Sequence, residues 1–123
     1  RRPRSQFLGS GSPLRSGRND TEVKVMAQET SHTICEWGDA TFGAAPDLTA
    51  LLARARGEMD ELEQALRSND HAEAGKEAAD VVILLHRLAA ILGQDLNEQV
   101  DAKMVINRAR KWKAVGDGTG GHV

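Results

Sequence analysis

The chain has 123 residues, a formal net charge of −2, 28% charged residues and only 3% aromatic residues. This length fits one domain whose core is so small that packing against a second copy would help to bury it, and we therefore expect a homo-oligomer. The single cysteine, Cys35, excludes an internal disulfide, and the longest apolar stretch is too short to cross a bilayer, so we expect a soluble cytoplasmic (intracellular) protein without a membrane partner.

Residues 1–29 form an opening segment with five arginines before its first acidic residue, Asp20. The segment contains several serines and glycines and few apolar residues, which is typical first of a disordered arm and second of a targeting segment. A nucleic-acid-binding arm and a leader would share this composition. We assign no function to this basic extension, expect no nucleic-acid partner, and predict one domain over residues 30–115.

The domain is predicted to begin with a short lead-in over residues 30–44. Ile34, Trp37 and Phe42 lie there among polar residues, with glycines as breakers at positions 38 and 43. This pattern favours a short helix or an irregular segment over a strand.

A first long helix is predicted over residues 46–67. Pro46 tolerates the first turn of a helix, and the acidic Asp47 complements the helix dipole. Apolar residues then recur at steps of three and four, which indicates one continuous apolar stripe along the helix. The stripe consists of Leu48, Leu51, Leu52, Ala55, Met59, Leu62 and Leu66.

A second helix is predicted over residues 71–92, because Asp70 and Glu73 have the spacing of a capping box and Gly93 ends the apolar pattern. This helix is apolar over most of its circumference, so it must be covered on more than one side, and a partner chain is the simplest source of that cover. We interpret His86 as an interface residue hydrogen-bonded to a neighbour and prefer this role to metal ligation.

A third helix is predicted over residues 96–112, since Asp95 and Glu98 repeat the capping spacing. Residues 116–123 are rich in glycine and are predicted to form an irregular tail. The sequence therefore predicts an all-α fold, a helical bundle of three main helices with a short N-terminal helix or lead-in, completed by oligomerisation.

One acidic residue of the second helix lies where an apolar residue is expected. At helical spacing, Glu77 falls in the same lengthwise row as Val81 and Leu84. A buried carboxylate needs a proton, a cationic side chain or a metal ion as its partner, because an isolated one would cost several kcal/mol or more.

Three further acids lie close to this row. Glu58 and Glu61 border the stripe of the first long helix, and Asp80 follows Glu77 by three residues on the second. Two antiparallel helices joined by a short turn would bring the four carboxylates together, and a site made only of oxygen donors selects Mg²⁺, with Mn²⁺ as a substitute, over Zn²⁺. Either pair alone is more often a solvated face, but two pairs beside apolar stripes on adjacent helices favour a metal site.

The third helix carries groups that bind phosphate. Lys103, Asn107, Arg110 and Lys111 recur at steps of three and four on the side that continues from its apolar residues. We predict that they face the acids and hold a polyphosphate, for which Lys and Arg are suited. A basic helix end that complements its own dipole is the alternative, which we accept for Arg108 and Lys113.

Three segments resemble the signature of the MazG-type all-α nucleoside triphosphate pyrophosphohydrolases: Glu58-Met-Asp-Glu61, Glu77-Ala-Ala-Asp80 and residues 103–112. The similarity covers most of residues 30–123, and residues 37–43 and 117–123 resemble the branch of small, MazZ-like dATP/dGTP diphosphohydrolases. The resemblance implies hydrolysis of a nucleoside triphosphate to a monophosphate and pyrophosphate, with Mg²⁺ on the acids. It also implies homodimers or dimers of dimers whose sites lie partly at chain interfaces. This chain departs from the family at Gly57, where a further glutamate is common.

On this resemblance we expect in-line attack of an activated water on the α-phosphorus, with Glu61 as the general base. Trp37 and Phe42 are candidates to stack on the base, and anchoring the lead-in to the core is the alternative for both. Two other functions stay open. One is a non-enzymatic helical oligomerisation or adaptor module in which the charges form inter-helix ion pairs. The other is a superfamily relative that hydrolyses dUTP, dCTP or phosphoribosyl-ATP.

Overall fold

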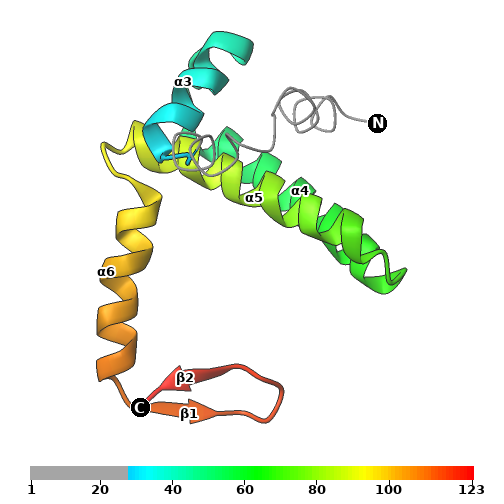
Figure 1. The fold of residues 1–123 in the computed structure, drawn as a ribbon, viewed down its shortest axis with the longest axis vertical. Helices are drawn as coiled ribbons and strands as arrows, with labels where there is room; N and C mark the ends of the chain where they lie inside the picture. The colour runs from blue at the N-terminus through cyan, green and yellow to red at the C-terminus, as the bar shows by residue number, and fades with distance from the viewer. Residues whose placement is uncertain (1–27) are drawn as a thin grey trace, which may run out of the picture.

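The computed structural model describes residues 28–123, so the predicted basic extension lies almost entirely outside the described residues. The described part is mainly helical, which confirms the predicted all-α class (Figure 1). Its elements are α3 (Ser31–Phe42), α4 (Leu48–Arg67), α5 (His71–Ile91), α6 (Leu96–Ala109), β1 (Trp112–Ala114) and β2 (Gly120–His122).

Helices α4 and α5 form an antiparallel hairpin that is the longest part of the structure (Figure 1). Helix α4 begins two residues later than predicted, because Asp47 takes the N-cap position and its carboxylate accepts the backbone N–H of Thr49. The turn that follows contains Asn69 in the left-handed region, at φ 57°. Asp70 then caps α5 by accepting the N–H of Glu73 at 3.1 Å, as the spacing predicted.

Small residues dominate the core of the hairpin. Ala55, Ala65, Ala74 and Ala89 are buried together with Leu51, whereas several large residues of the two helices remain exposed. The exposed ones are Leu52, Met59 and Leu66 on α4, Val82 and Ile91 on α5, and Leu92 just after it. The apolar stripe predicted for α4 is therefore only partly covered, and the hairpin keeps a second apolar surface.

Helix α3 packs against α5 through a close contact at Gly38. A Cβ at this position would overlap the guanidinium of Arg87, so only glycine lets the two helices approach this closely. Arg87 is 5% exposed, and its Nη2 donates to Asp39 Oδ1 at 3.0 Å and to the carbonyl oxygen of Gly43 at 3.2 Å. A paired, buried arginine thus fixes α3 on the second long helix.

Helices α3 and α6 begin at the same place and cap each other. The N–H of Ser31 donates to Asp95 Oδ1 at 2.9 Å, and the N–H of Leu96 donates to Ser31 Oγ at 2.7 Å. Asp95 consequently makes no capping bond within α6, and the predicted capping box is wrong at this helix. Ser31 Oγ also lies 2.7 Å from Nδ1 of the buried His86, so that histidine has a hydrogen-bond partner within its own chain.

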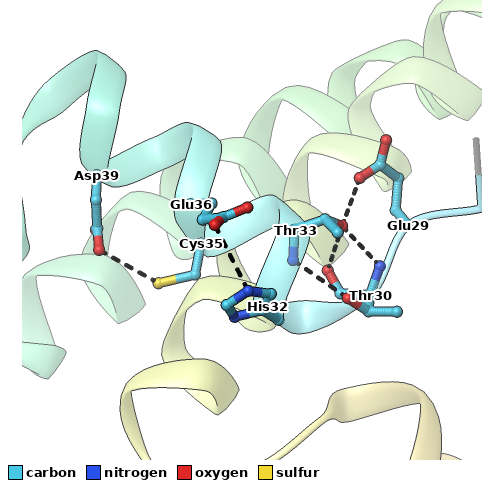
Figure 2. A network of polar contacts seen from close by, with 7 residues as sticks. All are labelled: Glu29, Thr30, His32, Thr33, Cys35, Glu36 and Asp39. Carbon is cyan, nitrogen blue, oxygen red and sulfur yellow. Dashed lines mark hydrogen bonds and ion pairs between the residues drawn. The ribbon is translucent and has the colours of Figure 1, made fainter.

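Further polar contacts fix the first turns of α3 (Figure 2). Thr30 and Thr33 bond each other reciprocally, since each side-chain oxygen accepts the backbone N–H of the other residue. The hydroxyl of Thr33 also donates to Glu29 at 2.7 Å. On the next turn, the thiol of Cys35 donates to Asp39 at 3.7 Å, and burial raises the pKa of this thiol, in keeping with a structural role.

Helix α6 leaves the hairpin and points away from it (Figure 1). None of its residues is buried. The chain then forms a short antiparallel β-hairpin in which Trp112 pairs with His122, so the predictions of a helix to residue 112 and of an irregular tail are wrong. Gly116 and Gly118 adopt positive φ in the connecting turn, and the carboxylate of Asp117 accepts bonds from Thr119, which together close it.

Within residues 28–123, no helix is both long and apolar enough to cross a membrane.

The mutual cap predicts how stability depends on pH. The Ser31 N–H bonded to the carboxylate holds the pKa of Asp95 below its usual range. A depressed folded-state pKa stabilises the fold above the ordinary carboxyl pKa of about 4, and this contribution is lost as the pH falls through the folded-state pKa. We expect Asp95→Asn to unfold at lower urea concentration than the wild type at pH 7, with a difference that shrinks below about pH 4.

Urea denaturation followed by circular dichroism between pH 7 and pH 3 measures this difference. Asp101→Asn, an exposed site on α6, is the matched control and should behave as the wild type does. If the loss of stability in Asp95→Asn were the same at every pH between 7 and 3, the charge of Asp95 would not be what stabilises the contact between α3 and α6.

Candidate metal centre

Three of the four predicted metal ligands converge between α4 and α5. Glu58, Glu77 and Asp80 each offer a carboxylate oxygen, and these oxygens all lie within 4.8 Å of one another. Glu58 is 2% exposed, Glu77 is fully buried and Asp80 is half-buried. We call these three residues the acidic group.

Helix geometry explains how the acidic group forms. Glu77 and Asp80 are three residues apart, so they lie on one face of α5, and Glu58 reaches them from the antiparallel neighbour. The buried alanines Ala55 and Ala74 each lie one turn before an acid, and their small side chains let the two helices approach each other. The carboxylates are therefore held by the middle of two regular helices and not by loops.

The donor set of the acidic group fits a hard divalent cation. An octahedral Mg²⁺ or Mn²⁺ ion holds its oxygen ligands at about 2.1 Å, which places them about 3 Å apart for adjacent positions and about 4 Å for opposite ones. The spacing of at most 4.8 Å needs only small side-chain rotations to reach these values. Three carboxylates at this distance in a largely buried setting also repel one another, and a divalent ion would neutralise much of that charge.

Glu61, the fourth predicted ligand and the candidate general base, lies one turn farther along α4. It is half-buried and is not a member of the acidic group. Its position at the edge of the group is compatible with a base that is not itself fully engaged as a ligand, and both of its roles stay predictions.

The predicted phosphate-binding residues do not face the acidic group within one chain. Lys103, Arg110 and Lys111 are exposed, and Asn107 is half-buried with its amide 3.9 Å from the sulfur of Met104. Helix α6 points away from the hairpin of its own chain (Figure 1), so a role of these residues beside the acids stays a prediction. The mutual cap of α3 and α6 sets this direction, and helical periodicity does not encode it.

The two candidate base-binding residues lie together on α3. The rings of Trp37 and Phe42 meet edge to face with centroids 5.6 Å apart, and the residues are 38% and 68% exposed. Phe42 is therefore largely uncovered, whereas most of Trp37 is covered, and anchoring of the lead-in stays open for Trp37. Stacking on a nucleobase stays a prediction for both.

Sequence reasoning missed one cation beside the acids. Nη2 of Arg54 lies 3.0 Å from Oε2 of Glu58, and the side chain of Arg54 is 57% exposed. The sequence did indicate this contact, because Arg54 and Glu58 are four residues apart and such residues are neighbours on a helix. The same reasoning also missed Ser31, whose bonds join three helices and leave no periodic pattern in the sequence.

Two phage proteins are similar to this chain. A protein of Salmonella phage PMBT28 named dATP/dGTP diphosphohydrolase is 36% identical over 120 residues, which cover 96% of this chain and 38% of that protein. A protein of Cyanophage S-2L with the same name is 43% identical over 58 residues, which cover 47% of this chain and 55% of that protein. The chain therefore covers less than two thirds of either relative. No protein-family model and no solved structure matches it.

The acidic group predicts a metal-dependent rise in stability. A ligand that binds only the folded state at 100 times its Kd stabilises it by about 2.7 kcal/mol, so Mn²⁺ at that level should raise the melting temperature of the wild type by several degrees. Glu77→Gln removes one charged ligand and should abolish most of this shift. Melting curves with and without Mn²⁺ measure it.

Glu63→Gln is the matched control, because Glu63 lies on the exposed surface of α4. The control should keep the full Mn²⁺ shift. If Mn²⁺ raised the melting temperature of Glu77→Gln as much as that of the wild type, the acidic group would not be the place where the ion binds.

Proposed function

We propose that this chain is a metal-dependent nucleoside triphosphate pyrophosphohydrolase of the MazG type, which cleaves dATP or dGTP to the monophosphate and pyrophosphate. The observation that carries the proposal is the acidic group, three carboxylates gathered in the buried middle of a helix pair. The similarity to two phage proteins named dATP/dGTP diphosphohydrolase supports the choice of substrate.

Glu58, Glu77 and Asp80 would hold Mg²⁺, with Mn²⁺ as a substitute. When bound, the ion supplies positive charge to phosphate oxygens and lowers the pKa of water in the site. The surrounding alanines and half-buried aliphatic side chains limit access of bulk water, which strengthens every charge interaction in the group.

The reaction transfers the α-phosphoryl group to water. The water oxygen forms a bond to the α-phosphorus, the bond from this phosphorus to the bridging oxygen breaks, and pyrophosphate leaves. Glu61 takes the proton of the attacking water, since it lies one turn from Glu58 at the edge of the group. Trp37 and Phe42 stack on the purine, whose large ring system suits an exposed aromatic pair.

The predicted phosphate-binding residues of α6 and of the two positions after it take part in this scheme through a second copy of the chain. Helix α6 exposes Val100, Val105 and Ile106 at 53%, 68% and 46%, and the hairpin exposes an apolar surface of its own. Burying these surfaces against each other in a homodimer or dimer of dimers would remove apolar area from water. The same contact would bring Lys103, Asn107, Arg110 and Lys111 of one copy toward the phosphates held by the other.

Product analysis tests the activity. With Mg²⁺ present, we expect the protein to convert dATP and dGTP to the monophosphate and pyrophosphate, and to act more slowly on dCTP, dUTP and phosphoribosyl-ATP. Asp80→Asn should lower kcat by about 100-fold or more, because it removes a charged ligand from the ion that activates the water. Separation of the nucleotides by chromatography and a pyrophosphate assay measure both.

Asp60→Asn, the same chemical change at an exposed position of α4, should leave kcat unchanged. If the products were the nucleoside diphosphate and inorganic phosphate, the proposed cleavage between the α- and β-phosphates would be overturned. A complete lack of turnover with every nucleotide, and with it no response to Mg²⁺, would favour the helical adaptor module.

The proposed assembly is tested by its mass in solution. Light scattering after size-exclusion chromatography should give a mass of two or four chains for the wild type. Val105→Glu places a charge on the exposed apolar part of α6 and should lower that mass, whereas Gln99→Glu adds the same charge at an exposed polar position of the helix and should not. A wild-type mass of one chain would contradict the assembly.

A further inference from the structure

Arg54 places a positive charge at the outer edge of the acidic group. Its Nη2 lies 3.0 Å from Oε2 of Glu58, whose side chain is only 3% exposed, while the arginine side chain itself is 57% exposed. The guanidinium therefore bridges a buried carboxylate and the solvent. An entering anion would meet this cation before it reached the acids.

Helix stabilisation gives only a weak account of this ion pair. A glutamate placed before its basic partner stabilises a helix better than the reverse order, because that order matches the helix dipole. Glu63 and Arg67 on the same helix have the favourable order and are both exposed. Arg54 and Glu58 have the reverse order, and their acid is one of the proposed metal ligands.

Entry of a divalent ion would change the position of this arginine. Glu58 would then serve as a ligand of the ion, and the like charges of the ion and the guanidinium would repel each other. Arginine carries five N–H donors in a planar fork that matches phosphate geometry. Because its side chain is half in solvent, it can turn from Glu58 toward a phosphate held over the ion.

We propose that Arg54 is a positioning residue which holds Glu58 while the site is without metal and contacts the triphosphate of the substrate once the ion is bound. This inference rests on the proposed function and adds a residue to it. This role of Arg54 requires that its loss change the affinity for the metal ion and the affinity for the nucleotide in opposite directions. Loss of the arginine charge should strengthen binding of the metal ion alone and weaken binding of the nucleotide.

Calorimetric titration separates the two effects. With Mn²⁺ alone, Arg54→Gln should bind the ion about two- to fivefold more tightly than the wild type, as expected for the loss of a competing ion pair at a partly exposed site. With saturating Mn²⁺ and a dATP analogue whose α–β bridging oxygen is replaced by a methylene group, Arg54→Gln should bind about tenfold more weakly, as for the loss of a charged hydrogen bond.

Two further variants sharpen the result. Arg54→Lys keeps the charge and loses the fork, so its Mn²⁺ affinity should stay near that of the wild type while its affinity for the analogue falls. Arg67→Gln removes an ion-paired arginine from the far end of α4 and should change neither affinity. Melting curves verify that all variants are folded.

The inference fails if Arg54→Gln weakens both affinities together or changes neither, because a purely structural ion pair predicts those results. Failure of the proposed function gives a different result, since the wild type itself would then bind neither Mn²⁺ nor the analogue. If the wild type binds both Mn²⁺ and the analogue, and Arg54→Gln binds them with the same affinities, only the role of Arg54 is overturned.

Discussion

The burial of Glu77 is the constraint on which the rest of the structure depends. A carboxylate with no solvent exposure between two helices is tolerated only where its charge is compensated, and here two further carboxylates lie within 4.8 Å of it. An aliphatic residue at this position would give the hairpin a better core. The arrangement therefore supports the proposal of a cation at this place, and the small alanines around it let the two helices approach each other.

The acidic group was predictable because it depends on local order alone. Spacing of three and four residues fixes which side chains share a helix face, and a short turn makes neighbouring helices antiparallel, so Glu58, Glu77 and Asp80 could be brought together from the sequence. The direction of α6 was not predictable in this way. It depends on Ser31 and Asp95, which are 64 residues apart and bond each other across two helix starts.

The β-hairpin at the end of the chain shows a second limit of periodicity. Its glycines indicate only that the backbone can adopt many conformations, and the same composition is typical of an irregular tail. The observed turn depends on positive φ at Gly116 and Gly118 and on the bonds from Thr119 to Asp117. Similarly, Gly38 was interpreted as a helix breaker, but it lies inside α3 because its missing side chain makes room for Arg87.

The structure divides the proposed site into a fixed part and an adaptable part. Glu58, Glu77 and Asp80 lie in the middle of long helices, where the backbone is fully hydrogen-bonded and packed, so the geometry offered to an ion varies little. The cations of α6 lie on an arm without a single buried residue, which is joined to the rest of the structure at its first turn. Under the proposed function, metal binding would therefore depend on one chain and phosphate binding on the assembly.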